Sequence, residues 1–448
     1  MKLVYNVKDK PKFGQLIVFA FQQLLAILAA TIAVPAIIQN GMSQSAALFG
    51  AGIGTIMYLL FTKFKSPVFL GSSFAFLGSM FAAFGGAVST AAGYAGLILG
   101  AVFAGLVYVI IAIVVKLAGV NWINKLMPPV VIGPTVAIIG LSLAGNAIGD
   151  SLNKTANFDA ASSAFLMNTN AWVCLICALV TLFTVVICSV YGKKTAKLIP
   201  FIIGILAGYA VATIFTLIGT KTGNAALVVI DFTKFASMQW TPDFTFLKAG
   251  KALQEIDAKY IATIAVAYVP VAFVVFAEHI ADHKNLSSII DADLLEEPGL
   301  HRTLLGDGIG SMVGAFFGGC PNTTYGESVG CVAITGNASV ITILATAIMA
   351  IIVSFFGPFV TFLATIPSCV MGGVCITLYG FIAVSGLKML QKVNLDDNSN
   401  LFVVSVILIA GIGGMALKIG QVTLTSIACA LIFGIITNLI LKNKRNAQ

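Results

Sequence analysis

Long apolar runs separated by short polar segments restrict the fold of this chain more than any other feature. We divide the 448 residues into fourteen such runs, at residues 13–38, 45–62, 67–84, 92–116, 129–147, 171–191, 197–219, 259–281, 303–318, 321–335, 338–365, 368–388, 400–416 and 420–441. A helix needs roughly 20 apolar residues to cross the hydrocarbon core of a bilayer. The sequence therefore predicts an all-α polytopic membrane protein with about 14 transmembrane segments.

The composition supports this prediction. Hydrophobic residues make up 59% of the chain and charged residues 9%, whereas a soluble domain carries about 25% charged residues. A transmembrane barrel is not expected, because its strands would alternate polar and apolar residues over about ten positions. The net charge is +8, but the basic residues are scattered at the ends of the runs, so we expect no nucleic-acid partner.

The basic residues also predict the orientation in the membrane. With a cytoplasmic amino terminus, eighteen of the 25 Lys and Arg residues fall in cytoplasmic segments and seven fall outside. This bias is the positive-inside pattern. We expect a multi-pass protein of the cell (cytoplasmic) membrane with both termini in the cytoplasm. Two polar segments, at about 148–170 and 220–258, then face outward as loops, with some strand or short helix in the second.

Matching proline and glycine patterns indicate an internal repeat. The fifth run opens PPVVIGPTVAIIGLSLAG at Pro128, and the twelfth opens PSCVMGGVCITLYGFIAVSG at Pro367. The third opens PVFLGSSFAF at Pro67, and the tenth opens PNTTYGESVG at Pro321. Both pairs are seven runs apart, and an odd offset makes the second copy enter the membrane from the opposite face. Such inverted repeats are typical of secondary transporters.

This offset divides the chain into two halves. We predict a first repeat of seven segments at residues 1–219, an extracellular connecting loop at 220–258 and a second repeat at 259–448.

The third and tenth runs are too short and too polar to be plain spanning helices. The third has Gly71, Ser72 and Ser73 in its first half, and the tenth contains two threonines and two glycines within PNTTYGESVG. Irregular backbone at membrane depth must be buried in protein or line a cavity, because its N–H and C=O groups need partners. We therefore predict half-helices with free amides that form a site for a small polar molecule.

Two carboxylates fall inside apolar runs. Glu278 lies in the eighth run and Glu327 in the tenth. A charged side chain at the membrane centre costs about 2.5 to 3.5 kcal/mol on insertion scales, and the sequence supplies few buried cations, because its basic residues are peripheral. Each carboxylate must bind hydrogen-bond donors or take up a proton, and the second outcome suits a proton carrier. For Glu278 the alternative to a buried site residue is a residue at the membrane interface. This alternative is weaker for Glu327, because apolar residues flank it on both sides.

Further polar residues follow Glu278. Asp282 lies four residues later and therefore on the same helical face, whereas His279 and His283 share another face. A zinc site formed by these four residues is the alternative, but their spacing matches no common metal motif. We expect no metal site.

Other motifs are interpreted as packing. All eight cysteines lie in or beside apolar runs, so we infer no disulfides, and we attribute the CxxC at Cys174 and Cys177 to helix packing. GAGIG at 50–54 and GDGIG at 306–310 lack the preceding strand of a phosphate loop and indicate close helix packing. No nucleophile with a nearby base is evident, so we do not expect the protein to be an enzyme.

Several of these segments resemble the nucleobase–cation symporter-2 family. They are VFAEHIADHKN around Glu278, PGLHR at 298–302, PNTTYGESVG around Glu327, LGSSFAF around Phe74 and ATIAVP at 30–35. The resemblance spans almost the whole chain. It implies fourteen segments in two inverted repeats of seven, with short strands in segments 3 and 10. It also implies a core domain of segments 1–4 and 8–11 and a gate domain of segments 5–7 and 12–14.

The resemblance further implies a secondary-active uracil:proton symporter. Glu278 and Glu327 would accept hydrogen bonds from the ring N–H groups, Phe74 and Gly326 would contribute backbone contacts, and Tyr325 would line the pocket. The NTTYGE segment is similar to the uracil branch of the family rather than to its xanthine and urate branches. A purine symporter of the same fold, for xanthine or urate, stays the alternative.

Two positions depart from the family pattern. Members commonly carry EHxxH after the eighth-segment glutamate, but here Asp282 takes the fourth place and His283 follows it. Gln22 and Gln23 stand where a glutamine–histidine pair is often found. The candidates for proton coupling are Glu278, Glu327, Asp282 and His283.

We expect no cofactor other than the proton as coupling ion. The expected partners are uracil or a related nucleobase, membrane lipid and a second copy of the chain bound through the gate domain. A passive channel and an anion transporter of the related sulfate-carrier architecture are the remaining alternatives. The anion transporter would need a cation near the site, and the sequence shows none there.

Overall fold

Helices make up most of the computed structural model. It describes residues 3–119, 128–153, 155–159, 162–193, 196, 199–238, 240–252, 254–391, 393–419, 422–424 and 426–445. The α-helices are α1 (Phe13–Ile38), α2 (Gln44–Phe61), α3 (Leu77–Gly85), α4 (Thr90–Ala118), α6 (Pro129–Ser142), α7 (Ala144–Ser151), α8 (Thr169–Tyr191), α10 (Pro200–Thr222), α11 (Thr245–Ala249), α12 (Ala258–Ile290), α13 (Leu300–Gly318), α14 (Gly326–Thr335), α15 (Val340–Ser354), α16 (Gly357–Thr365), α17 (Ser368–Leu390), α18 (Asn398–Ile412) and α19 (Ser426–Arg445).

Short elements connect these helices. The strands are β1 (Leu70–Ser72), β2 (Asn157–Asp159), β3 (Ala164–Leu166), β4 (Asn322–Thr324), β5 (Leu417–Ile419) and β6 (Val422–Leu424), and they pair as β1 with β4, β2 with β3 and β5 with β6. The short helical turns are η1 (Phe74–Phe76), η2 (Ala225–Leu227), η3 (Phe232–Ser237), η4 (Gly250–Ala252) and η5 (Leu295–Gly299).

The lengths of the helices confirm a polytopic membrane protein. Among the described residues, eight helices are long and apolar enough to cross a bilayer, counting the broken helix α6–α7 as one. Helices α15 and α16 meet at an angle of 82° and would add a ninth span if they are counted together. Three further apolar helices among the described residues are shorter, at Phe74–Gly85, Asn398–Ile412 and Ser426–Leu441, and the first of them follows strand β1 after Ser73.

Most predicted runs coincide with helices, but the connections differ from prediction. Helix α1 has the predicted limits of the first run, 13–38. Strands β2 and β3 form a hairpin in the segment 148–170, where no strand was predicted, whereas the described part of the connection at 220–258 contains short helices, one of the two alternatives predicted there. The hairpin is held by an edge-to-face contact between Phe158 and Phe165, with ring centroids 5.3 Å apart. A single aromatic pair in three-residue strands leaves too little alternation for sequence patterns to detect.

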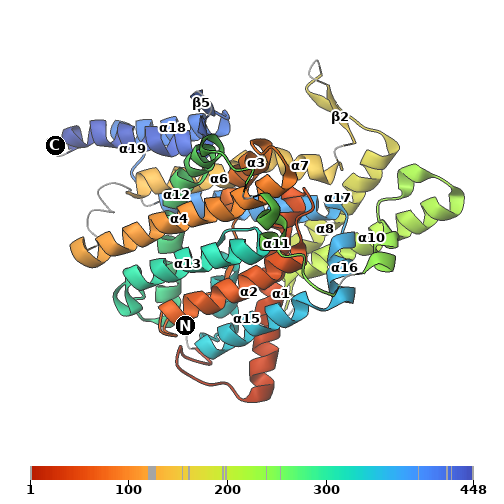
Figure 1. The fold of residues 1–448 in the computed structure, drawn as a ribbon, viewed down its shortest axis with the longest axis horizontal. Helices are drawn as coiled ribbons and strands as arrows, with labels where there is room; N and C mark the ends of the chain where they lie inside the picture. The colour runs from red at the N-terminus through yellow and green to blue at the C-terminus, as the bar shows by residue number, and fades with distance from the viewer. Residues whose placement is uncertain are drawn as a thin grey trace.

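The helices pack in two sets that meet along α1 and α12. Helices α2, α4 and α13 lie side by side with α15 and α1 beside them, and α6, α8, α10 and α17 form the neighbouring set. Both chain ends lie at the left of Figure 1, and the β2 hairpin projects at the right. Many elements from the two halves of the chain contact each other directly, among them β1 with β4, α2 with α13 and α6 with α17.

Glycines allow the closest of these contacts. A Cβ atom on Gly50 of α2 would lie 2.5 Å from the carbonyl oxygen of Gly314 in α13, and one on Gly54 would lie 2.7 Å from that of Gly310. In the α6–α17 contact, a Cβ on Gly133 would lie 3.0 Å from a backbone oxygen of α17. Small residues are the usual means of bringing helix backbones together in membranes.

We expect the replacement Gly50→Ala to destabilise the protein by about 1 to 3 kcal/mol. The added methyl group meets backbone rather than a movable side chain, so α2 and α13 must separate. The midpoint of unfolding in detergent measures the effect. Gly380→Ala in α17 is the matched control, because nothing lies within 4 Å of its Cβ position. Equal stability of the two variants would contradict the prediction.

Candidate functional site

A buried ladder of two strands connects the two halves of the chain. Strand β1 pairs antiparallel with β4, with Gly71 opposite Thr323, and all six strand residues are buried. The amide of Ser73 continues the ladder by donating to the carbonyl of Pro321 at 2.9 Å. Proline lacks an N–H group and takes the place just before β4, where no donor is needed. The ladder thus supplies the backbone hydrogen bonds that the interrupted segments need.

Helix α2 supports this ladder from one side. The Nδ2 atom of Asn322 donates to the carbonyl of Gly50 at 2.9 Å. The amide of Leu70 donates to Oγ1 of Thr55 at 2.9 Å. Oγ1 of Thr55 also donates to the carbonyl of Leu70 at 3.2 Å, so both strands are attached to α2 by hydrogen bonds, which fix the ladder against this helix.

Helix α14 begins immediately after β4 and presents its amino terminus to the site. Gly326 is its first residue, and Glu327 lies in the first turn. The first amides of a helix have no acceptor within the helix and carry partial positive charge. The hydroxyl of Ser328 accepts hydrogen bonds from Nε2 of Gln23 at 2.5 Å and from the amide of Phe69 at 3.2 Å. These bonds attach the start of α14 to α1 and to the segment before β1.

The predicted carboxylates come together at this helix end. Glu278 of α12 lies close enough to Glu327 and Asp282 for electrostatic interaction with both. Glu278 and Glu327 are each partly exposed rather than buried in packed side chains. Oγ1 of Thr324 donates to Oδ2 of Asp282 at 2.7 Å and connects α12 to β4. The shared face predicted for Glu278 and Asp282 therefore points toward β4 and α14.

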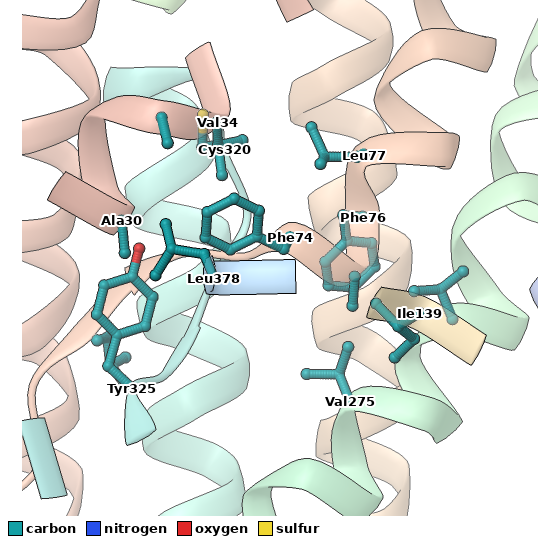
Figure 2. Close-up of a cluster of buried hydrophobic side chains, with 14 of the residues drawn as sticks. Ala30, Val34, Phe74, Phe76, Leu77, Ile139, Val275, Cys320, Tyr325 and Leu378 are labelled. Atoms are coloured by element: carbon teal, nitrogen blue, oxygen red, sulfur yellow. The ribbon is translucent and has the colours of Figure 1, made fainter. Parts of the chain in front are cut away.

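Apolar contacts position the other predicted residues. Figure 2 shows the ring of Phe74 in a cluster of apolar side chains beside Leu378 of α17. The ring makes an edge-to-face contact with Tyr379, with centroids 5.7 Å apart. Tyr325 is buried, and its hydroxyl donates to the carbonyl of Ser72 at 2.8 Å. Because packing holds the ring of Phe74, only its backbone remains for polar contacts.

The two histidines lie on another face of α12, as predicted, in a fully buried polar cluster. Their rings stack with centroids 4.0 Å apart. Nδ1 of His279 lies 2.7 Å from Oδ2 of Asp307, and its Nε2 lies 2.9 Å from Oγ1 of Thr303. Nε2 of His283 lies 2.7 Å from the hydroxyl of Tyr58. This cluster, formed by Tyr58, His279, His283, Thr303 and Asp307, connects α12 to α2 and α13.

His283 was predicted as a proton-coupling residue, and its place in the cluster gives it other partners. Its Nδ1 lies 2.8 Å from the carbonyl of His279 and its Nε2 contacts Tyr58. His283 follows Glu278 by five residues, so its side chain lies about 140° around the axis of α12 from that of Glu278. Both ring nitrogens of His283 are thus engaged in the cluster.

Sequence reasoning missed Asp307 and Tyr58. Asp307 is a third carboxylate inside an apolar run, at 303–318, and the GDGIG segment that contains it was interpreted only as packing. The packing is present, since Gly310 contacts the backbone of α2. The signal that could have revealed Asp307 is the one used for Glu327, a carboxylate flanked by apolar residues. Tyr58 carries no such signal, because buried tyrosines are common.

The described residues contain no group of three or more His, Cys, Asp or Glu side chains arranged to hold a metal ion. The site instead combines carboxylates, the amino terminus of α14 and interrupted helices inside a polytopic helical fold. Half-helices whose amino termini face a central site are a hallmark of secondary transporters. Fold and site together define a membrane transport protein.

Comparison with known proteins agrees with this class. Residues 14–420 match the model of the Permease family that includes xanthine and uracil permeases. The chain belongs to this family, which is the nucleobase–cation symporter-2 family expected from the sequence. It is a permease and not an enzyme.

Individual relatives are similar over their full length. The chain is 39% identical to the uracil permease of Bacillus caldolyticus, and the match covers 100% of this chain and 96% of that one. It is 36% identical to the uracil permease of Bacillus subtilis (strain 168), over 100% and 97% of the two chains. It is 34% identical to the uracil permease of Escherichia coli (strain K12), over 98% and 94%.

Solved structures share the fold at lower identity. The transmembrane domain of the cyanobacterial bicarbonate transporter BicA superposes with a TM-score of 0.65 at 16% identity, over 96% of this chain and 99% of that one. The murine anion transporter Solute Carrier 26 family member A9 also gives 0.65, at 11% identity, over 98% of this chain and 69% of that one. At these identities the likeness concerns the fold alone.

Proposed function

We propose that this protein imports uracil across the cytoplasmic membrane in symport with protons. The observation that supports the proposal is that Glu278 of α12 interacts electrostatically with Glu327, which lies in the first turn of α14. The edge of uracil alternates N–H donors with C=O acceptors, which carboxylates and amides complement. A site built to pair such groups discriminates strongly against molecules that lack them. The names of the relatives point to the same substrate.

The predicted residues have distinct roles in this proposal. Glu278 and Glu327 accept hydrogen bonds from the ring N–H groups. The backbone at Phe74 and Gly326, at the starts of η1 and α14, faces the ring oxygens. Tyr325 lines the pocket, and its hydrogen bond to Ser72 keeps the two strands together.

Proton coupling rests on the same carboxylates. Two acidic side chains that interact electrostatically in a largely apolar surrounding are unfavourable if both are charged. Protonation of one of them, Glu278 or Glu327, lowers the negative charge of the site, and together with uracil binding it permits the core domain to move against the gate domain. Asp282 adds a third acidic group on the same face, and His283 is the remaining candidate carrier.

The proposed transport motion takes place between two domains of the fold. We propose fourteen segments in two inverted repeats, at 1–219 and 259–448, with the segment 220–258 outside the cell and both termini in the cytoplasm. The contacts of β1 with β4, α2 with α13 and α6 with α17 support the repeats, because each pair is seven segments apart. A core domain of segments 1–4 and 8–11 carries the site, and a gate domain of segments 5–7 and 12–14 also forms the homodimer.

Uptake into proteoliposomes tests the proposal. With an acidic exterior, we expect radiolabelled uracil to accumulate above its external concentration, and a protonophore to abolish the accumulation. The pH gradient supplies the driving force, so equal internal and external pH leaves only equilibration. Uptake that never exceeds equilibration would indicate a passive channel. Accumulation that persists after the protonophore would contradict proton coupling.

A xanthine or urate symporter is the alternative within the family. Competition for the uptake of labelled uracil separates the two. We expect excess unlabelled uracil to abolish the uptake of labelled uracil and xanthine to leave it nearly unchanged.

A further inference from the structure

The segment before α1 lies along the connection between α14 and α15. The amides of Val4 and Tyr5 donate to the carbonyl of Gly336, at 2.8 and 3.2 Å. The carbonyl of Tyr5 in turn accepts a hydrogen bond from the amide of Ala338 at 2.9 Å. We call residues 4–9 the amino-terminal strap. The far end of α14 is thus bonded to a segment from the beginning of the chain.

Helix α15 is bonded to the same strap at its start. The amide of Val340 donates to the carbonyl of Val7 at 3.1 Å, and Oγ of Ser339 donates to the carbonyl of Asp9 at 2.6 Å. Ser339 is the N-cap residue of α15, a position where a serine side chain usually accepts a hydrogen bond from the helix. Here that side chain makes no capping bond and binds the strap instead. The strap therefore holds both sides of the connection between α14 and α15.

The strap is itself anchored to α1. The hydroxyl of Tyr5 donates to Oε1 of Gln15 at 2.6 Å, and its ring makes an edge-to-face contact with Phe19, with centroids 6.0 Å apart. Gln15, Phe19 and Gln23 are spaced four residues apart and therefore share one face of α1. Gln23 binds Ser328 at the start of α14. One face of α1 thus holds α14 directly at its start and through the strap at its end.

Helix α14 depends on such contacts because it is short. Its 10 residues give a length of about 15 Å, which is half of a bilayer core about 30 Å thick. Helices shorter than about 12 residues are marginal on their own in water, and packing must hold them. Glu327 in the first turn lies nine residues before Gly336, about 13.5 Å along the axis. A shift at the far end of this short rigid helix therefore moves the carboxylate as well.

We propose that the amino-terminal strap is a positioning element for Glu327, which sets the place of α14 and thereby the affinity for uracil. The strap acts through α14 and not by contact with the substrate. Binding groups must be held to within about 0.5 Å of their productive place, and the bonds of the strap to Gly336 and to α1 provide this support at the end of α14. The proposal rests on the proposed function, because it requires Glu327 to accept a hydrogen bond from the ring of uracil.

Equilibrium binding of radiolabelled uracil to the purified full chain in lipid nanodiscs tests this proposal. Tyr5→Pro removes the amide that binds Gly336 and the side chain that binds α1. We expect its dissociation constant to rise roughly 10-fold, because misplacement of a binding group by about 1 Å is costly. Ser339→Ala removes one bond to the strap without removing a helix cap, so we expect a rise of about 3-fold. Tyr5→Phe keeps the amide and the ring, and this conservative control should bind nearly as wild type does.

A double variant separates the positioning of Glu327 from a general loss of stability. Glu327→Gln lacks the carboxylate, so in that background Tyr5→Pro should weaken uracil binding by less than about 2-fold. If Tyr5→Pro does not fold, Ser339→Ala carries the same comparison. Single effects that multiply in the double variant, or wild-type affinity in both strap variants, would overturn the strap proposal. Absence of uracil binding from wild type would instead overturn the proposed function, so the two failures are distinguishable.

Discussion

Replacement of Glu327 by glutamine should abolish concentrative uracil uptake. The amide cannot carry the proton, and it presents an N–H group where the ring N–H needs an acceptor. Loss of a hydrogen bond to a charged group costs about 1.5 to 3 kcal/mol, which corresponds to roughly 10- to 100-fold weaker binding. Proteoliposome uptake under a pH gradient measures the transport defect, and binding to purified protein measures the loss of affinity.

Two further variants complete this experiment. Glu278→Gln should have an effect in the same direction, because Glu278 interacts with Glu327 and shares the ring N–H groups in the proposed site. Glu296→Gln is the matched control, because this glutamate is exposed in η5. Normal concentrative uptake by Glu327→Gln would remove that residue from the mechanism.

Replacement of Asp307 by leucine should destabilise the fold by about 3 to 5 kcal/mol. Breaking one side of a buried pair leaves the other side without its partner. Here the N–H group of His279 would lose the carboxylate oxygen 2.7 Å away, in a place where both side chains are 0% exposed. The midpoint of unfolding in detergent provides the measurement. Asp307→Asn keeps an acceptor oxygen and should lose much less.

A double variant tests whether the hydrogen bond between His279 and Asp307 contributes to the stability of the fold. When both partners of a buried polar pair are replaced by apolar groups, the change can be nearly neutral. His279→Leu combined with Asp307→Leu should therefore be more stable than Asp307→Leu alone. If the two single effects simply add, the stability does not depend on this hydrogen bond.

The sequence predicted the spanning helices well because their lengths are fixed by the bilayer. A helix such as α1 must be apolar over its whole length, and its predicted and observed limits agree. The bend of 82° between α15 and α16 was less visible, because the run 338–365 is apolar on both sides of it. The place of the break depends on packing of α15 and α16 against α2.

The site was predictable where polar groups conflict with apolar surroundings. Glu278 and Glu327 stood out for this reason, and the two side chains interact electrostatically. Asp307 conflicts with its surroundings equally but was read as part of a glycine motif. The contact of Thr324 with Asp282 could not be foreseen, since it joins residues 42 positions apart through the β1–β4 ladder. Helical spacing identifies a face but not the element it meets.

The pairing of β1 with β4 has a consequence for how such a chain can be divided. Within the described structure each of these strands finds its only sheet neighbour in the opposite half of the polypeptide. If the two halves were produced as separate fragments, each would expose an open strand edge to lipid until it met the other. An ancestral protein of half this length would have needed a second copy in the opposite membrane orientation to complete the same ladder.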